Sequence, residues 1–477
     1  MTLATAKPIL LGGHWVQTSA VEAVRNPFSN EVLAMVCQAE AEHIHQVVES
    51  VKRISTEFAK IPAHARAKGL LHIAAGLASR REEFAITICQ EAGKPITDAR
   101  REVDRAIQTF RIASEESTRI PGEILPMDLT PGGEAYSGSV KRFPIGTVLG
   151  ITPFNFPLNL VAHKVAPCLA AGNPMVLKPA PQTPLTSLLL GEVFLTTELP
   201  PETLTIIPCS NALAEQMVIH PAFQALSFTG SMTIGWMLKG KAGYKRVLLE
   251  LGGNAGVIIE ADANLDVAID RCVTGGYGYS GQTCISVQRI FVHESLYDQF
   301  LKSFVERVRA LPMGDPSLEK TVVGPLINEQ AARRVEAWIQ EAVSQGATIL
   351  TGGTRKHSFI EPAVLTHVSS NMKVCCEEIF GPVVTVTPYA HLEEALTLHN
   401  DSEFGLQAGI FTSNIDTMYQ AYSQLEVGAL LVNEIPTFRA DHMPYGGIKQ
   451  SGLGREGVRY AIQELTEPRL LVVKTPS

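Results

Sequence analysis

Short apolar runs alternate with helical windows between Thr147 and Glu250, and this alternation limits the possible folds more than any other feature. The strand-like runs are VLGIT, MVLK, LTIIP, ALSFTG and RVLLE. Segments with helical spacing separate them, beginning near residues 159, 184, 211 and 231. Strands that alternate with helices predict parallel βαβ units and a doubly wound sheet. This architecture is typical of nucleotide binding.

A second α/β series follows NAGVIIEADANLD. Strands are predicted at RIFVH, ATILTG, FIEPAVL, VVTVTPY, AGIFTS and GALLVN, with amphipathic helices such as YDQFLKSFVERVRAL between several of them. Residues 42–118 instead carry apolar side chains three and four apart, which predicts an all-helical stretch. A chain of 477 residues is too long for one hydrophobic core. The expected fold class is therefore α/β, with two doubly wound domains.

Two segments match neither predicted sheet. They are the hairpin-like EAYSGSVKRFPIG and the terminal TEPRLLVVK. An exposed strand edge promotes aggregation unless another strand covers it. We therefore expect these strands to form a small β extension that pairs with another subunit, so that the chain is a homo-oligomer, either a dimer or a dimer of dimers.

Charge and hydropathy restrict the class of partner. A net charge of −8 argues against nucleic acid or an anionic membrane as the main partner. The N-terminal sequence MTLATAKPILLGGHW does not resemble a secretory signal, and the chain has no apolar run of about 18 residues that could cross a membrane. We expect a cytoplasmic protein that acts on small molecules.

The eight cysteines are scattered, without the spacing of a zinc site, so no metal is expected and the cysteines should be thiols. The adjacent Cys375 and Cys376 could suggest a redox switch, but neighbouring cysteines form a disulfide only with a strained peptide. Most of these side chains are expected to be small buried hydrophobes.

The stretch GYGYSGQTC, residues 276–284, allows two interpretations. Its glycines fit the GxGxxG dinucleotide fingerprint, but the preceding LDVAIDRCVTG has helical spacing and is not the required strand. SFTGSMTIG is a better phosphate site, because Gly230 permits a tight turn and Ser231 can cap the following helix. An ordinary capped turn would explain the same pattern. GYGYSGQTC is then interpreted as a glycine loop that presents Cys284.

Two further side chains could complete a cysteine-dependent site. Glu250 ends a predicted strand and is followed by Gly252 and Gly253, so it lies where ligands bind in open α/β sheets. Asn155 lies between Pro153 and Pro157, and a rigidly held amide can donate to an oxyanion. Asn155 could equally satisfy the backbone of a turn.

Seven motifs together resemble the aldehyde dehydrogenase superfamily over essentially the whole chain. They are TPFNFP (152–157), VLKP (176–179), FTGS (228–231), ELGGN (250–254), GQTC (281–284), EEIFGP (377–382) and PYGGIKQSGLGRE (444–456). The resemblance implies NAD(P)-dependent, hydrolytic oxidation of an aldehyde. Cys284 would be the nucleophile, Asn155 with the backbone N–H of Cys284 the oxyanion hole, and Glu250 the base that activates water.

The resemblance also implies a cofactor site. Lys178 matches the residue that binds the adenosine ribose, Ser231 one that contacts the pyrophosphate, and Glu378 and Phe380 those beside the nicotinamide ribose. The other expected cofactor-binding residues are Thr152, Pro153, Phe154, Gly230, Leu251 and Gly252. Many NAD-preferring members have a glutamate where this chain has Pro181, so NADP should be accepted as well as NAD.

The implied substrate is a small polar or anionic aldehyde, as in lactaldehyde, glyceraldehyde-3-phosphate and semialdehyde dehydrogenases. The expected substrate residues are Phe156, Leu160, Thr283, Ile285, Arg439 and His442. Arg439 and His442 could bind an anionic group, although a surface salt bridge of Arg439 with Asp441 is an equal alternative. A CoA-acylating enzyme, a catalytically silent binding protein and a cysteine hydrolase remain rival functions.

The implied domain boundaries follow from the same resemblance. We expect residues 1–122 and 143–250 to form a Rossmann-like cofactor-binding domain, and residues 251–432 to form the catalytic domain. Residues 123–142 and 462–477 would be the oligomerisation strands. Residues 433–461 would return to the side of the cofactor domain.

Overall fold

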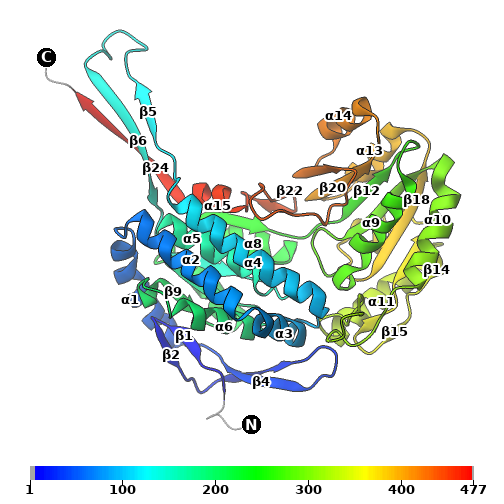
Figure 1. Cartoon of the computed structure of the whole chain (residues 1–477), viewed down its shortest axis with the longest axis horizontal. Helices are drawn as coiled ribbons and strands as arrows, with labels where there is room; N and C mark the ends of the chain where they lie inside the picture. Colours follow the sequence, from blue (N-terminus) through cyan, green and yellow to red (C-terminus); the bar gives the residue numbers. More distant parts are fainter. Residues whose placement is uncertain (1–5, 475–477) are drawn as a thin grey trace.

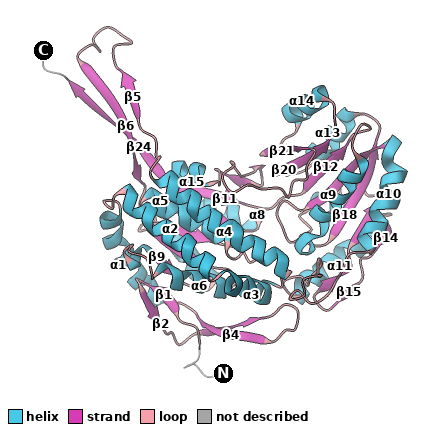
Figure 2. Cartoon of the chain, viewed as in Figure 1, coloured by secondary structure: helices cyan, strands magenta, loops and turns pink. Residues whose placement is uncertain are grey.

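The structure is a computed structural model that describes residues 6–474. The outermost parts of the expected cofactor domain and terminal strand, residues 1–5 and 475–477, lie outside the described residues. The chain has two β-sheets flanked by helices and a three-stranded extension that projects from the body (Figures 1 and 2). The predicted α/β fold class is confirmed.

The first sheet has the strand order β2-β1-β9-β8-β7-β10-β11-β23. Its five central strands are all parallel, and they are β9 (Leu204–Ile206), β8 (Met175–Lys178), β7 (Val148–Ile151), β10 (Ala225–Thr229) and β11 (Arg246–Glu250). These are the strands predicted from the five apolar runs, and all but the first two residues of β11 are buried. Continuous burial explains why they read as uninterrupted hydrophobic segments.

Antiparallel strands that sequence patterns did not indicate extend this sheet at its edges. They are β1 (Ile9–Leu11), β2 (His14–Val16) and β23 (Gly452–Leu453). A separate hairpin precedes the helices and consists of β3 (Val21–Arg25) and β4 (Val32–Cys37).

Helices cover the first sheet on both faces, as its doubly wound topology requires. The first four are α1 (Ala41–Phe58), α2 (Ala63–Ser79), α3 (Arg81–Ala92) and α4 (Ile96–Ser117), in the predicted helical region. The connections between strands contain α5 (Asn159–Ala171), α6 (Leu185–Phe194), η2 (Pro201–Thr203), α7 (Asn211–Ile219) and α8 (Met232–Lys241). The α5 helix is buried along its whole length, between this sheet and α4.

The second sheet has the strand order β14-β17-β18-β13-β12-β20-β21, and all its strands except β14 run parallel to their neighbours. Its strands are β12 (Ala255–Ile259), β13 (Val287–His293), β14 (Thr348–Thr351), β17 (Ala363–Thr366), β18 (Val383–Tyr389), β20 (Gln407–Phe411) and β21 (Ala429–Val432). Six of these strands lie in segments that the sequence predicts as strands of the second series. The seventh, β12, lies in the NAGVIIE segment that precedes that series and was not predicted as a strand.

The remaining elements surround the second sheet or connect it to the first. The helices are α9 (Leu265–Tyr277), η3 (Gly278–Gly281), α10 (Glu294–Arg309), α11 (Glu329–Ser344), α12 (Lys373–Cys376), α13 (Leu392–Asn400), α14 (Ile415–Gln424) and α15 (Val458–Glu464). Two short pairs complete the strands, β15 (Arg355–Lys356) with β16 (Phe359–Ile360), and β19 (Phe404–Gly405) with β22 (Ile448–Lys449). No helix within residues 6–474 is both long and apolar enough to span a membrane.

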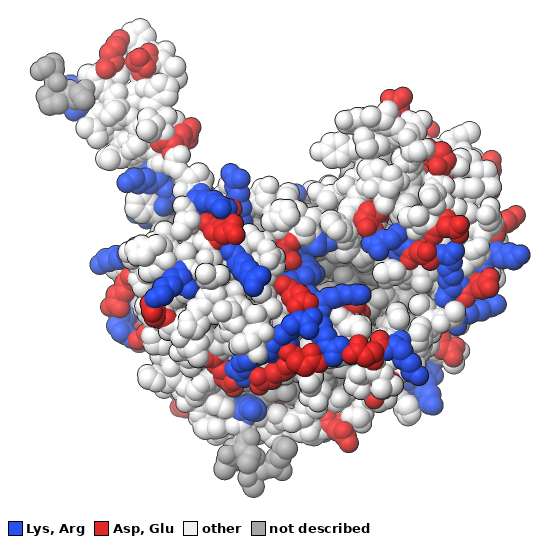
Figure 3. Space-filling model, in the orientation of Figure 1, with Lys and Arg blue, Asp and Glu red and all other residues white. Residues whose placement is uncertain are grey.

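The projecting extension joins both segments that the sequence left without a partner. The terminal strand β24 (Thr466–Lys474) pairs antiparallel with β6 (Tyr136–Pro144), which also pairs with β5 (Glu123–Pro126). Apolar side chains on it are exposed, among them Ile124 at 85% and Leu471 at 62%. Figure 3 shows few charged side chains on this extension, whereas both signs of charge intermingle over the body.

Candidate active site

Three adjacent parallel strands end at the candidate site. Glu250 is the last residue of β11, it pairs in register with Thr229 at the end of β10, and Asn155 lies in the loop that follows β7. Since parallel strands present their carboxyl ends at one edge of a sheet, these residues share the edge where ligands bind in α/β folds. Both Glu250 and Asn155 are buried.

The loop that carries Cys284 is sharply bent. It leaves the helix α9 through η3, in which Tyr279, Ser280 and Gly281 all have positive φ angles of 48°, 56° and 70°. A Cβ atom on Gly281 would lie only 2.2 Å from the carbonyl oxygen of Gly381. The glycine is therefore needed for close backbone contact, and the loop follows a helix. Both observations support the interpretation of GYGYSGQTC as a cysteine loop.

Hydrogen bonds join the cysteine loop to the loop of Asn155. Asn155 Nδ2 donates to the carbonyl oxygen of Gln282 at 3.0 Å. Because an amide nitrogen has two N–H groups, the other one remains for an oxyanion beside Cys284. On the other side of Cys284, its Sγ atom lies 3.0 Å from the hydroxyl oxygen of Tyr445. Burial raises the pKa of the Cys284 thiol to about 12, although the bond to Tyr445 opposes this.

Glu250 is buried and has both a carboxylate and cations nearby. Its Oε2 atom is buried without a hydrogen-bond partner among the described residues. Burial raises the pKa of Glu250 well above its usual value, the charge of Glu456 raises it further, and Arg439 and Lys164 oppose the change. A Cβ on Gly446 would approach Glu250 Oε1 to 2.9 Å. The glycine of the PYGG motif thus leaves space for this carboxyl group.

A buried cluster of three charges lies behind the site. Glu456 accepts from Lys164 at 3.2 Å and from Arg439 at 3.1 Å. Burial alone would raise the pKa of Glu456, but these two cations lower it to about 2. The alternative of a surface Arg439–Asp441 salt bridge is wrong, because the Arg439 side chain is only 5% exposed and bonds to Glu456. Asp441 instead bonds to Arg105 and His163.

The residues expected to hold a dinucleotide line the same edge of the first sheet. The helix α8 begins after Gly230 and Ser231, and the Ser231 hydroxyl caps none of its N–H groups. Lys178 ends β8 in a buried position that lowers its pKa. An uncapped helix N-terminus with a free hydroxyl suits a pyrophosphate. The Thr229 hydroxyl is also buried without a partner among the described residues.

The second part of the expected cofactor site faces Glu250 from the other sheet. Glu378 Oε1 accepts from the backbone N–H of Gly253 at 3.0 Å, and a Cβ on Gly252 would lie 2.6 Å from Glu378 Oε2. Burial raises the pKa of Glu378 to about 7. The ring of Phe380 packs edge-on against Phe154, with centroids 5.9 Å apart. This glycine-lined space beside a carboxylate and two rings fits a nicotinamide riboside, which when bound would accept a hydride.

Comparison with known proteins decides the family. The sequence model of the aldehyde dehydrogenase family matches residues 15–471. The chain belongs to the aldehyde dehydrogenase family. The prediction of an NAD(P)-dependent oxidoreductase that acts on aldehydes is thereby confirmed.

Relatives and solved structures resemble this aldehyde dehydrogenase over almost its whole length. A 3-sulfolactaldehyde dehydrogenase of Priestia aryabhattai is 40% identical, covering 98% of this chain and 97% of that protein. A lactaldehyde dehydrogenase of Methanococcus aeolicus is 36% identical, covering 98% and 100%. Aldehyde dehydrogenase 21 of Physcomitrella patens, solved with the reaction product succinate, has a TM-score of 0.97 and 44% identity, covering 98% of both chains.

A solved structure with a bound cofactor is also similar. It is the glyceraldehyde-3-phosphate dehydrogenase GapN of Methanocaldococcus jannaschii in complex with NADP. The identity is 34% and the TM-score 0.92, covering 96% of this chain and 100% of that one.

The expected substrate residues differ in how far they are buried. Leu160 and Ile285 are buried, Phe156 and Thr283 are half-buried, and His442 is exposed. Ile285 contacts Tyr445 and Leu406 beside Cys284.

The sequence analysis gave no role to three residues that lie at the site. They are Lys164, Tyr445 and Glu456. Tyr445 and Glu456 lie in a recognised motif, but no local pattern indicates their contacts.

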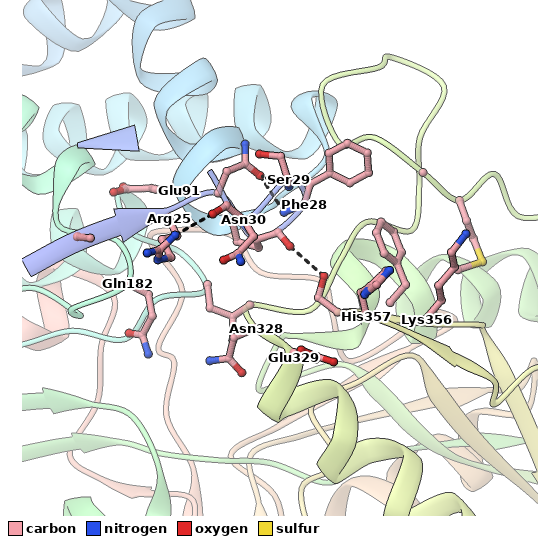
Figure 4. A pocket seen from close by; sticks show the side chains of 18 of the residues that line it. Arg25, Phe28, Ser29, Asn30, Glu91, Gln182, Asn328, Glu329, Lys356 and His357 are labelled. Carbon is pink, nitrogen blue, oxygen red and sulfur yellow. Dashed lines mark hydrogen bonds between the residues drawn. The ribbon is translucent and has the colours of Figure 1, made fainter. Parts of the chain in front are cut away.

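A large cavity lies apart from the three expected catalytic residues. Its volume is about 1060 Å³, and it lies between the β3–β4 hairpin and the start of α11 (Figure 4). Arg25, Asn30, Gln182 and Asn328 line it, together with Pro181. Neither Cys284 nor Glu250 is among its lining residues. Through Pro181 the cavity reaches the loop that follows Lys178.

A buried ion pair supports the loop of Asn155. Lys94 is paired with Glu102, and both side chains are no more than 1% exposed. The Glu102 carboxylate also accepts from the backbone N–H groups of Leu158 and Asn159, at 2.9 and 3.1 Å. The Lys94 ammonium lies 3.6 Å from the centroid of the Phe156 ring. Both partners thus hold the segment that follows Asn155.

Removal of one partner of this pair should destabilise the protein. In Lys94→Ala the Glu102 carboxylate keeps its backbone donors but loses its counter-charge, and an uncompensated buried charge typically costs about 3–5 kcal/mol. We expect a clearly lower thermal midpoint at a fixed scan rate. Lys68→Ala is the control, since it removes an exposed pair with Glu198 and should change the midpoint little. Equal midpoints for the two variants would contradict this expectation.

Proposed function

We propose that this aldehyde dehydrogenase oxidises a small polar or anionic aldehyde to the free acid, with Cys284 as nucleophile and Glu250 as the base for hydrolysis. The observation that carries the proposal is the bond from Asn155 to the loop of Cys284, which joins an oxyanion donor to a thiol at the edge of the sheet where Glu250 ends. In acyl transfer Cys284 would then be the nucleophile, Asn155 the oxyanion donor and Glu250 the base.

The proposed reaction has three steps. The Cys284 thiolate forms a bond to the aldehyde carbon, and the carbonyl oxygen becomes an oxyanion that accepts from Asn155 Nδ2 and from the N–H of Cys284. Departure of a hydride, which NAD(P)+ would accept when bound, restores the carbonyl and leaves a thioester. Water then gives a proton to the Glu250 carboxylate and bonds to the thioester carbon, and the carbon–sulfur bond breaks to release the acid and the Cys284 thiolate.

The similar proteins and Arg439 support an anionic substrate. The similar proteins include a 3-sulfolactaldehyde dehydrogenase and an aspartate-semialdehyde dehydrogenase, and one similar structure contains succinate. Arg439 lies in the site, and its Nε–H is buried without a partner among the described residues. A panel of sulfonated, carboxylated, phosphorylated and uncharged short aldehydes, followed by NAD(P)H absorbance, tests the proposal. A preference for uncharged apolar aldehydes would contradict it.

NADP should be accepted as a cofactor as well as NAD. Pro181 places no carboxylate beside the expected site of the adenosine ribose, so nothing at this position repels a 2′-phosphate. We expect Pro181→Glu to lower kcat/KM with NADP by about tenfold or more, because one unfavourable charge contact costs about 1.4 kcal/mol or more. The value with NAD should change much less. Wild-type efficiency with NAD that exceeds NADP by orders of magnitude would contradict the expectation.

Hydrolysis is favoured over transfer to CoA because Glu250 is present at the site. The product distinguishes the two reactions, since free acid should form at the same rate with and without added CoA. Acyl-CoA formation that depends on CoA would assign the chain to the acylating type.

The proposed location of the protein is the cytoplasm. A nucleophilic thiol needs a reducing compartment, and the cytoplasm provides one.

We further propose that the chain divides at the expected domain boundaries and forms a homo-oligomer through its extension. Residues 9–16 and 452–453 join the first sheet, as expected for a cofactor domain formed by residues 1–122 and 143–250 with 433–461 beside it. The β5–β6–β24 extension exposes apolar side chains and has open strand edges, which another subunit would cover. Light scattering measures the subunit number.

A further inference from the structure

Tyr445 touches the atom at which the proposed reaction begins. Its hydroxyl oxygen lies 3.0 Å from Cys284 Sγ. While Cys284 is a thiol, either atom can donate in this bond. Once the sulfur is deprotonated, only the Tyr445 hydroxyl can donate, and the bond becomes charge-assisted. The contact is therefore stronger with the reactive thiolate than with the thiol.

We propose that Tyr445 is a further catalytic residue, whose hydroxyl donates a hydrogen bond to the Cys284 thiolate and increases the fraction of enzyme that is ready to attack the aldehyde. This inference rests on the proposed role of Cys284 as the nucleophile. Tyr445 and Asn155 would have different roles, because Tyr445 donates to the sulfur whereas Asn155 is proposed to donate to the substrate oxygen.

The backbone holds Tyr445 in place for this contact. Its N–H donates to the carbonyl oxygen of Glu456 at 3.0 Å, and the N–H of Glu456 donates back at 2.7 Å. The ring is only 3% exposed and packs with Ile285 and Leu406. The hydroxyl is thus aimed at the sulfur before the substrate arrives, and no side chain has to be ordered when the thiolate forms.

Arg439 lies over the ring of Tyr445. Its guanidinium carbon is 3.7 Å from the ring centroid, and Glu456 fixes the guanidinium group from the other side. The positive charge over the ring favours the phenolate form and so lowers the pKa of Tyr445, which makes the hydroxyl a stronger donor. Burial nevertheless raises the pKa of Tyr445 well above its usual value, so the hydroxyl keeps its proton. Tyr445 therefore remains a donor at the pH at which the enzyme works.

The other charged groups near Cys284 make this donor necessary. Burial raises the pKa of the thiol, and the carboxyl groups of Glu378 and Glu250 raise it further when they are charged. Tyr445 and Arg439 act in the opposite direction. Of these two, Tyr445 is in direct contact with the sulfur. Its bond weakens after attack, because a neutral sulfur bonded to two carbons is a poorer acceptor than a thiolate.

Two substitutions of Tyr445 test the inference by changing one atom each. Tyr445→Phe removes only the hydroxyl oxygen, whereas 3-fluorotyrosine at position 445 keeps the shape and is a stronger donor. The measurement is the rate at which iodoacetamide alkylates Cys284 from pH 6 to pH 10 in the full-length protein without cofactor. Mass spectrometry of the Cys284 peptide separates this thiol from the other cysteines. Tyr389→Phe is the control, since Tyr389 bonds to Ile259 and Glu260 in the second sheet.

The two substitutions should act in opposite directions. We expect alkylation at pH 7 to fall about three- to tenfold in Tyr445→Phe, because loss of thiolate exceeds the gain in nucleophilicity of each thiolate. Fluorotyrosine should increase the rate, and Tyr389→Phe should leave it unchanged. An unchanged or faster rate in Tyr445→Phe, or a slower rate with fluorotyrosine, would overturn the inference. Failure of the proposed function would appear differently, as dehydrogenase activity that survives in Cys284→Ser.

Discussion

Cys284→Ser should reduce the formation of NAD(P)H by more than about 1000-fold, which corresponds to about 4 kcal/mol or more of transition-state stabilisation. A serine hydroxyl does not ionise at the pH of the assay, and no histidine within residues 6–474 hydrogen-bonds to the Cys284 side chain to deprotonate a serine there. The Cys284 thiol contacts Tyr445, and Asn155 is bonded to its loop. Loss of the sulfur should therefore remove covalent attack while leaving this arrangement in place.

A binding measurement and a control variant show whether the loss is chemical. Binding of NADP, followed by protein fluorescence, should be almost unchanged, because none of the residues expected to hold the cofactor is altered. Cys376→Ser is a suitable control, since the thiol of this half-exposed cysteine bonds to the backbone carbonyl of Asn371 and does not touch Cys284 or Glu250 in the described structure. Substantial dehydrogenase activity in Cys284→Ser would rule out the proposed mechanism.

The sequence predicted the parts of the fold in which local pattern and environment agree. The central strands of the first sheet are buried on both faces, so each appears as an apolar run between helices. Strands β1, β2 and β23 have only two or three residues, and β1 and β23 join the sheet through strands that are distant in the chain. Such short edge strands have no periodicity that could be recognised.

The same distinction applies to the site. Cys284, Glu250 and Asn155 lie in glycine- or proline-flanked motifs that could be found along the chain. The ion pair of Lys164 with Glu456 joins residues 292 positions apart. Lys164 also lies in a helix that is buried on all sides, so no polar face distinguishes it from its neighbours. The contact of Tyr445 with Cys284 likewise depends on tertiary structure, although both residues lie in recognised motifs.

Glu250→Gln should separate the two halves of the reaction. The amide keeps the size of the side chain but cannot accept the proton of water, so the thioester should form and then persist. We expect a rapid burst of about one NAD(P)H per site, followed by turnover slowed by about 10²- to 10⁴-fold. Rapid-mixing absorbance measures both phases. Glu464→Gln, which alters a partly exposed carboxylate paired with Arg246, should behave as wild type.

The pH dependence of turnover gives an independent test of the same role. Burial raises the pKa of Glu250 well above its usual value, so the carboxyl group stays protonated, and cannot act as a base, over a pH range in which an exposed glutamate is already ionised. The active carboxylate accumulates as the pH rises through this elevated pKa. Turnover limited by hydrolysis should therefore increase with pH above the range in which exposed carboxyl groups titrate in the wild-type enzyme. In Glu250→Gln this increase should disappear, because the titrating group is gone. A parallel increase in both proteins would assign the activation of water to another residue.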